Sequence, residues 1–394
     1  MILTERKRIG ILTTGGTISS LNSPNGLKPA EGVIEYILEG LSFDKDTMVS
    51  KDKETEVKVI PILNKDSTNI TLYDQAHIAN EIFSLDKKYD GIVITHGTDT
   101  MQFTSSMLSI MLESPDVPIV LTGSMKTIKD QNTDASKNLM GAIISAKSQL
   151  SGVFIFFHGN LIPGSLAYET TTDLGLTFKS AVGNVATLKN NKLIFEVEIS
   201  EAKTLLPPLL NTNFDSSILT VTLSPSCQEL SVKEIDKRHN GVILLSYGSA
   251  GVPKHYVNTI HQLIERKIPV VLSSQVNSLH IGHGNYEINK VAEELGITSG
   301  LGLYSFDYAN MANSLGMLRV QRTNPKDKLN KFEEIFNKNI QLALNQKYII
   351  KSNNYKKIVE KISKYSESGL FMEMNSLFRK PRETIQQSKR LKTG

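Results

Sequence analysis

Two short apolar segments, each running into a turn rich in glycine and threonine, constrain the fold of this chain most. They cover residues 9–18 and 91–100, and both are typical of buried parallel strands. Ligands of open α/β sheets bind at the carboxyl ends of such strands. We therefore predict that Thr17 lies beside Thr98 and Asp99, in an arrangement suited to attack on a carbonyl carbon.

Strand-like and helix-like runs alternate along the chain, which is the pattern of βαβ units. The predicted fold class is α/β, with a larger N-terminal domain built on a parallel sheet and a smaller C-terminal α/β domain. Apolar runs predict strands at 9–13, 57–63, 91–96, 118–123, 152–158, 241–246 and 269–274. Helical spacing predicts helices at 30–39, 72–85, 100–113, 134–148, 255–266 and 327–344.

Interruptions of this pattern divide the chain into four parts. An N-terminal domain covers 1–205, and a linker rich in Pro, Ser, Thr and Asn covers 206–235. The C-terminal domain covers 236–345. A basic, helix-prone extension occupies 346–394.

The net charge of +4 arises from this extension, which holds 12 Lys and Arg against 4 Asp and Glu. The other 345 residues hold 32 basic and 36 acidic ones, so the body has no electrostatic footprint for nucleic acid. We expect the extension to be a solvated basic helix packed on the body. A docking element for nucleic acid, an acidic partner or a membrane surface is the less favoured alternative.

The N-terminal residues carry no apolar signal core with a cleavage site. No apolar run approaches the roughly 18 residues that cross a bilayer, so a cytoplasmic protein is expected. The single cysteine, Cys227, excludes an intramolecular disulfide and a Cys-based zinc site. His280 and His283 form the only close histidine pair, and without a third ligand nearby they are weak evidence for a metal. We expect neither a metal nor a cofactor.

The turn Thr14-Gly-Gly-Thr17 has two interpretations. Adjacent glycines leave backbone N–H groups uncovered, and the following threonine can present its hydroxyl there as a nucleophile. The same residues equally suit a tight turn without chemistry. A dinucleotide site is disfavoured because the segment lacks the G-x-G-x-x-G spacing and a helix directly behind it.

The second turn, 95–100, is also open to two interpretations. Thr98 and Asp99 can position water or relay a proton. Asp99 and Thr100 can also cap the helix that follows, and both roles are compatible. His96 fits a packed histidine at a strand end better than a catalytic base.

Two more polar segments follow predicted strands. Asp66-Ser-Thr-Asn69 can bind the amino and carboxylate groups of an amino acid, or it can cap the next turn. Asp130-Gln-Asn-Thr-Asp134 can support the site, or it can be a simple polar turn.

At these residues the chain resembles the bacterial-type L-asparaginase/glutaminase family, and its cytoplasmic branch more than its periplasmic one. The resemblance covers about residues 8–345. The matching segments are Thr14-Gly-Gly-Thr-Ile18, Asp66-Ser-Thr-Asn69, Ile94-Thr-His-Gly-Thr-Asp-Thr-Met101, Leu121-Thr-Gly-Ser-Met125 and Thr133-Asp-Ala-Ser-Lys-Asn-Leu139, with weaker matches at Ser246-Tyr-Gly-Ser-Ala-Gly251 and Val271-Leu-Ser-Ser-Gln275.

The resemblance implies that Thr17 attacks a side-chain amide and forms an acyl-enzyme, with Thr98 and Asp99 in a second catalytic group. It also implies that Ser67 and Asp99 hold the α-carboxylate and amino groups of a small amino-acid amide. Family members assemble as dimers of dimers with sites at subunit interfaces, so a homo-oligomer is expected. Substrate binding is assigned to Gly16, Asp66, Ser67, Gly97 and Ser124.

Two positions depart from the family pattern. The second catalytic group of the family includes a lysine, and here that position falls on Glu169, or on Tyr168 if the gap is placed differently. The mobile loop of the family carries a tyrosine, whereas this chain has Leu27 there, with Tyr36 as the nearest alternative.

Three functions follow from these residues. The favoured one is an asparaginase-type amidohydrolase that releases ammonia from L-asparagine or L-glutamine, with Lys126 or Lys179 as a substitute for the missing lysine. The second is a divergent enzyme acting on another amide, imide or lactam, such as a larger or cationic one. The third is a catalytically weak amino-acid-binding protein. Retention of Thr17, Thr98 and Asp99 favours the first.

Overall fold

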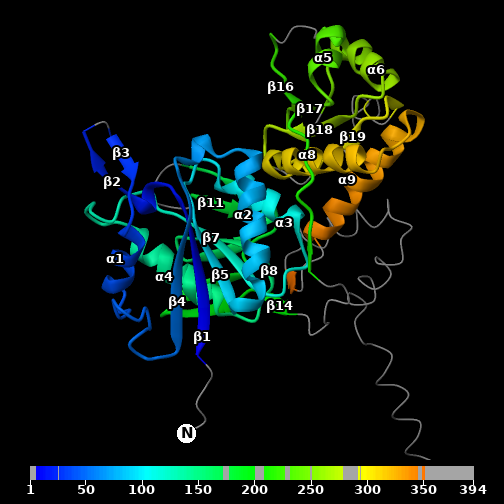
Figure 1. Ribbon diagram of the computed structural model, residues 1–394. Coiled ribbons are helices and arrows are strands. Elements are labelled where there is room, and N and C mark those ends of the chain that lie inside the picture. The colour runs from blue at the N-terminus through cyan, green and yellow to red at the C-terminus, as the bar shows by residue number, and fades with distance from the viewer. Residues whose placement is uncertain are drawn as a thin grey trace, which may run out of the picture. The chain divides into compact units, whose positions relative to one another are not determined.

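The computed structural model describes residues 6–24, 26–171, 177–199, 208–226, 231–248, 251–277, 292, 294–344 and 348–350 (Figure 1). These residues belong to one unit, Met1–Lys351. Within it, one sheet of eight strands and one of four carry most of the buried core.

The larger sheet has the strand order β13-β12-β9-β8-β7-β5-β1-β4. The five strands from β8 to β4 run parallel, as predicted. The other three continue the sheet antiparallel, so it is a mixed sheet rather than the predicted parallel one. The bounds are β1 (Lys7–Gly15), β4 (Thr55–Lys65), β5 (Gly91–Thr95), β7 (Pro118–Thr122), β8 (Gly152–Phe157), β9 (Asn160–Pro163), β12 (Ala186–Lys189) and β13 (Lys192–Phe195).

Four helices connect the parallel strands: α1 (Val33–Gly40), α2 (Leu72–Leu85), α3 (Met101–Met111) and α4 (Ala135–Ala146). Helix α1 contacts α4, and α2 contacts α3. All four were predicted from helical spacing. Helix α3 is shorter than predicted because its last two residues form β6 (Leu112–Glu113), which pairs with β15 (Leu209–Leu210).

Gly141 lets α4 approach the sheet closely, because a Cβ at this position would collide with the Phe156 ring of β8. We expect Gly141→Ala to lower the free energy of unfolding by about 1–3 kcal/mol, the usual cost of overpacking. Urea denaturation checks this. Gly40→Ala is the matched control, since a Cβ there meets nothing within 4 Å. Equal effects of the two substitutions would contradict the packing explanation.

The smaller sheet has four parallel strands in sequential order: β16 (Ile218–Thr222), β17 (Gly241–Ser246), β18 (Val270–Ser274) and β19 (Thr298–Ser299). Helices α5 (Val232–Arg238) and α6 (Val257–Glu265) connect its first three strands. Strand β16 and the start of α5 fall inside the predicted linker, 206–235. The linker interpretation was therefore wrong there, because flanking Ser, Thr and Asn residues hide a five-residue strand.

Two further helices are α8 (Tyr304–Val320) and α9 (Lys328–Leu344), of which only α9 was predicted. Helix α8 contacts α3, α9, β17 and β18. It escaped prediction because it is buried on several sides and its polar residues are buried as well, so no apolar stripe marks it. Asn310 and Asn313 illustrate this, since both accept hydrogen bonds from buried Asn339 at 2.9 and 3.1 Å.

Three more pairs of short strands form two-stranded sheets: β2 (Ser20–Ser23) with β3 (Gly26–Pro29), β10 (Ala167–Glu169) with β11 (Phe178–Ser180), and β14 (Val197–Ile199) with β20 (Tyr348–Ile350). Strand β20 contradicts the helix predicted from 346 onward at three residues. The remainder of that extension, Cys227, His280 and His283 lie outside the described residues. Within the described part of the chain, no helix could span a membrane and no cluster of three His, Cys, Asp or Glu could hold a metal.

Candidate active site

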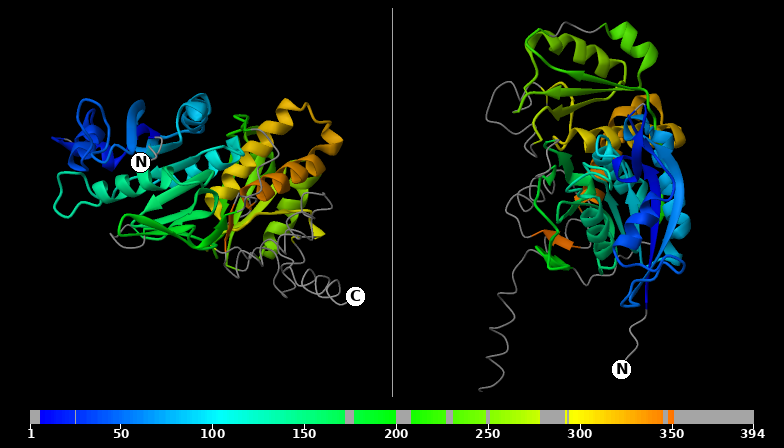
Figure 2. Two further views of the ribbon diagram at one scale, coloured as in Figure 1. Left: turned by 90° about the horizontal axis from the view of Figure 1, so that it is seen from below. Right: turned by 90° about the vertical axis from the view of Figure 1, so that its left-hand side faces the viewer.

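Four neighbouring parallel strands, β4, β1, β5 and β7, end at the same edge of the larger sheet (Figures 1 and 2). The turns that follow them carry Ser67, Thr17, Thr98 and Ser124, in that spatial order. Because neighbouring strands lie about 4.8 Å apart, turns that follow adjacent strands come together. The turns of Thr17 and Thr98 are therefore adjacent, as the sequence predicted.

Two glycines, Gly16 and Gly97, allow the first three turns to pack closely against one another. A Cβ on Gly16 would collide with backbone atoms of Gly97, and a Cβ on Gly97 would collide with the Ser67 side chain. Gly16 has φ 77° and ψ 176°, a conformation that is essentially restricted to glycine. Thr17 and Thr98 each follow one of these glycines directly, and both are half-buried.

Threonine hydroxyls also hold the turns together. The Thr14 hydroxyl donates to the Thr95 carbonyl at 2.8 Å, which joins the ends of β1 and β5. The Thr100 hydroxyl donates to the Ser67 carbonyl at 2.7 Å. Thr100 is the N-terminal cap residue of α3 but makes no side-chain capping bond, so its hydroxyl joins two turns instead.

His96 is fully buried and lies in a chain of hydrogen bonds. Its Nδ1 lies 2.7 Å from the Gly97 carbonyl and donates to it. Its Nε2 accepts from the Thr104 hydroxyl at 3.0 Å, and that hydroxyl accepts from the Gln75 amide at 3.1 Å. A neutral imidazole satisfies these bonds, and the arrangement agrees with the interpretation of His96 as a packed histidine that positions Gly97.

Burial lowers the pKa of His96 to about 4, from a usual 6.5, despite its bond to the Gly97 carbonyl. Between these two values the unfolded chain binds more protons than the folded one, so stability is lost as pH falls through this window. We expect a loss of up to about 3 kcal/mol in the free energy of unfolding. Urea denaturation from pH 7.5 to 4.5 measures it. His96→Gln should flatten the profile, whereas exposed His261→Gln should not.

Asp99 is exposed, and its carboxylate acts electrostatically on Glu169 of β10. Burial of Glu169 and, second, the Asp99 carboxylate raise the pKa of the Glu169 carboxyl above its usual value. The Glu169 N–H donates to Gln102 Oε1 at 2.6 Å, which fixes it on the first turn of α3. The sequence left open whether Glu169 or Tyr168 takes the place of the lysine, and of the two it is Glu169 whose pKa the Asp99 carboxylate raises.

Two side chains predicted to bind substrate, those of Asp66 and Ser124, form hydrogen bonds within their own turns. Asp66 is exposed and accepts bonds from the Thr68 N–H and hydroxyl at 2.9 and 2.7 Å, which corresponds to the capping alternative. The buried Ser124 hydroxyl donates to the Lys126 carbonyl at 2.7 Å. These bonds leave Oδ2 of Asp66 and the acceptor capacity of the Ser124 hydroxyl for other contacts.

The hairpin β2–β3 follows Thr17 and carries Leu27, which is 52 % exposed. Tyr36 lies on α1 and is 62 % exposed. Leu27 therefore offers an uncovered apolar side chain close in sequence to Thr17, at the position where the family has a tyrosine.

Asp134 supports the turn after β7 and was predicted only as part of a polar segment. Its carboxylate accepts bonds from the Met125 and Lys126 N–H groups and from Asn138 Nδ2, and it pairs with His158 at 3.4 Å. Burial acts to raise the pKa of Asp134, but the bonds from His158 and the two N–H groups hold it below its usual value. The role of His158, which follows β8, was not foreseen, because only the sheet brings it to Asp134.

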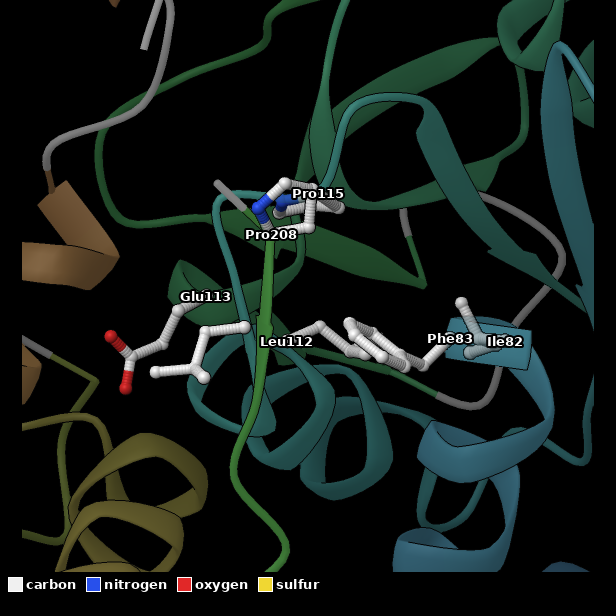
Figure 3. A pocket seen from close by; sticks show the side chains of 7 residues that line it. Ile82, Phe83, Leu112, Glu113, Pro115 and Pro208 are labelled. Carbon is white, nitrogen blue, oxygen red and sulfur yellow. The ribbon is translucent and has the colours of Figure 1, made fainter. Parts of the chain in front are cut away.

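Two hollows lack the three residues predicted to be catalytic, although the second is lined by Asp134, which supports the turn after β7. A small apolar one is bounded by α2, β6 and β15 and includes Ile82, Leu112 and Pro208 (Figure 3). A cavity of about 690 Å³ is lined by Lys137 and His158 among others. Neither is lined by Thr17, Thr98 or Asp99.

Comparison with known families gives two matches. The family model described as "Asparaginase, N-terminal" matches residues 8–200. The model described as "Glutaminase/Asparaginase C-terminal domain" matches residues 217–308. The first match includes the turns of Thr17, Ser67 and Thr98, together with Glu169.

Individual relatives agree with these matches. L-asparaginase of Thermococcus kodakarensis is 30% identical over 294 residues, 73% of this chain and 86% of the relative. A glutamyl-tRNA(Gln) amidotransferase subunit from Methanosphaera stadtmanae is 31% identical over 289 residues, 69% of this chain and 63% of the relative. The solved thermostable L-asparaginase of T. kodakarensis superposes with a TM-score of 0.70 at 27% identity, covering 84% of this chain and 97% of that one. The chain therefore belongs to the asparaginase family of amidohydrolases.

Proposed function

We propose that this protein hydrolyses the side-chain amide of L-asparagine or L-glutamine and releases ammonia. The observation that carries the proposal is the backbone contact of Gly16 with Gly97, which brings the turns of Thr17 and Thr98 together. Those are the two hydroxyl-bearing turns of the family motifs. Its relatives include proteins named L-asparaginase.

In this proposal the Thr17 hydroxyl attacks the amide carbon, and ammonia leaves as the acyl-enzyme forms. Thr98 and Asp99 belong to the second catalytic group, which serves the proton transfers. Ser67 and Asp99 hold the α-carboxylate and the amino group of the substrate. Gly16, Gly97, Asp66 and Ser124 supply the remaining contacts. Gly16 and Gly97 do so through backbone atoms, and Asp66 and Ser124 do so through acceptor oxygens that their local bonds leave unused.

Ammonia release from L-asparagine and L-glutamine by the purified protein tests this function. Turnover of either amide that saturates with its concentration is the expected result. Saturable binding of aspartate without ammonia release would instead support an amino-acid-binding protein. The cytoplasmic location and the homo-oligomeric assembly stay predictions, and size-exclusion chromatography with light scattering tests the second.

A second candidate function is hydrolysis of a different amide, imide or lactam. Exposed Leu27 in place of the loop tyrosine, and half-buried Glu169 in place of the lysine, favour it because both depart from the family pattern. The similarity to a component of an amidotransferase is in keeping with a family whose members differ in partner and use. Faster turnover of larger or cationic amides than of asparagine would favour this alternative.

A further inference from the structure

The segment 164–169 lies along α3 and runs toward the start of that helix. Ser105 Oγ donates at 2.8 Å to the carbonyl of the glycine that opens the segment. At the other end, the Glu169 N–H donates to Gln102 Oε1 at 2.6 Å. Gln102 precedes Ser105 by about one helical turn, so the segment ends beside the turn that carries Asp99.

The pairing of β10 with β11 decides which side chains share a face. Glu169 lies opposite Phe178, and Tyr168 lies opposite Lys179. Successive residues of a strand point to opposite faces, so Glu169 shares its face with buried Phe178 while Lys179 is on the other face. Lys179 is therefore not a substitute for the missing lysine beside Asp99.

Two other lysines near these turns, Lys126 and Lys65, have partners of their own. The Lys126 ammonium donates to the Gln131 carbonyl at 3.3 Å. The Lys65 ammonium pairs with Asp74 at 2.7 Å, in the turn after β4. Glu169 is bonded to Gln102, three residues along the chain from Asp99, and its carboxyl is the group on which the Asp99 charge acts.

Half-burial against Phe178 and the neighbouring Asp99 carboxylate give Glu169 the character of a base. Burial first, and Asp99 second, raise the pKa of Glu169. A carboxylate holds a transferred proton more firmly as its pKa approaches the working pH, and enzymes tune glutamates upward in this way. A lysine in the place of Glu169 would have the Asp99 carboxylate beside it, which favours the charged ammonium. Its pKa would therefore be lowered less than in an apolar pocket without a carboxylate.

We propose that Glu169 is the proton acceptor of this site, in the role for which related sequences use a lysine. This inference rests on the proposed function. As the bond from Thr17 Oγ to the amide carbon forms, the Thr17 proton passes to the Thr98 hydroxyl, which gives its own proton to Glu169. Glu169 returns that proton to the leaving nitrogen, and the C–N bond breaks to release ammonia.

The second half of the cycle uses the same groups in the opposite order. Water attacks the acyl carbon and its proton passes through Thr98 to Glu169. The bond from the carbon to Thr17 Oγ breaks, and Glu169 returns the proton to that oxygen. The sum is amide plus water giving carboxylic acid plus ammonia, so no oxidant, reductant or metal is needed.

The test compares wild type with Glu169→Gln, Glu169→Lys and the control Glu334→Gln, which removes one exposed carboxylate on α9. Steady-state ammonia release is measured between pH 4.5 and 10 in the full-length protein, with near-UV circular dichroism to check folding. Glu169→Gln keeps the size of the side chain and the backbone bond to Gln102. We expect it to lower kcat by about 10²–10⁴-fold with little change in KM, as for loss of an acid–base group.

The pH profiles distinguish a proton acceptor from a structural residue. In wild type, activity should fall on the acid side with a midpoint above that of an ordinary glutamate. In Glu169→Lys the midpoint should move to alkaline pH, because an amine must lose its proton to act as acceptor. A Glu169→Gln protein that keeps wild-type kcat and the same acid limb of the pH profile would overturn the inference. If Thr17→Ala is inactive in the same assay, the proposed function still stands. If wild type and Thr17→Ala are equally silent, the proposed function fails and the inference with it.

Discussion

Thr17→Ala is expected to reduce ammonia release by at least about 10³-fold, because it removes the atom that forms the covalent bond. Thr17 begins a short 3₁₀ turn, Thr17–Ser19, whose backbone bond from Ser19 N–H to the Gly16 carbonyl does not involve the Thr17 side chain. Alanine therefore fits the same backbone. The loss should appear in kcat, while binding of aspartate measured by calorimetry should change little.

Two further variants make this result specific. Thr17→Ser keeps a hydroxyl at the same place and should retain measurable turnover. Thr47→Ala removes an exposed threonine hydroxyl far along the chain, which bonds to Asp44, and should have wild-type activity. A Thr17→Ala protein with more than about a tenth of the wild-type rate would show that another group attacks the amide, and Thr98 would become the first candidate.

Much of the fold can be predicted from this sequence, because its buried strands carry continuous apolar runs. β5, β7 and β8 are buried at every residue, and their bounds agree with prediction to within a residue. Helix α8 could not be predicted, since its buried Asn310 and Asn313 bond to carbonyls that are far away in the sequence. Strand β16 is short and only partly buried, so its apolar signal is weak.

The candidate site likewise has features that the sequence predicts and features that it does not. The contact between the turns of Thr17 and Thr98 follows from two adjacent strand ends, so sequence reasoning could find it. The chain of hydrogen bonds from Gln75 through Thr104 to His96 depends on α2 and α3 packing together, which no local pattern encodes. Likewise, sequence left the choice between Glu169 and Tyr168 open. Our proposal of Glu169 depends on the register of β10 on β11 and on a single bond to α3.

The second large effect is expected from Gly16→Ala. Gly16 has φ 77° and ψ 176°, and an added Cβ would overlap the Gly97 N and Cα and the His96 carbonyl carbon. All of these are backbone atoms of a strand end, so they cannot turn aside as a flexible side chain can. Backbone strain and overlap together should cost about 3 kcal/mol or more in the free energy of unfolding. Activity should be lost with it, because the turns of Thr17 and Thr98 must separate.

Gly32→Ala provides the matched control. Gly32 also has a positive φ, 75°, but a Cβ there meets nothing within 4 Å. Its expected cost is about 1 kcal/mol, the usual penalty of left-handed backbone for a residue with a side chain. Urea denaturation of both variants therefore separates strain from overlap. Equal losses in the free energy of unfolding for the two variants would mean that the turns can move apart at little cost.

Gly97→Ala tests the other side of the same contact. Its Cβ would collide with the Ser67 side chain rather than with backbone, so the overlap can be relieved by a second substitution. We expect Gly97→Ala to be destabilising alone and to regain stability in combination with Ser67→Gly, a non-additivity that a double-mutant cycle measures. Gly16→Ala should gain nothing from Ser67→Gly. If the double variant Gly16→Ala with Ser67→Gly also regains stability, Ser67 and not the glycine backbones sets the spacing of the turns. The proposed juxtaposition of Thr17 and Thr98 then loses its structural basis.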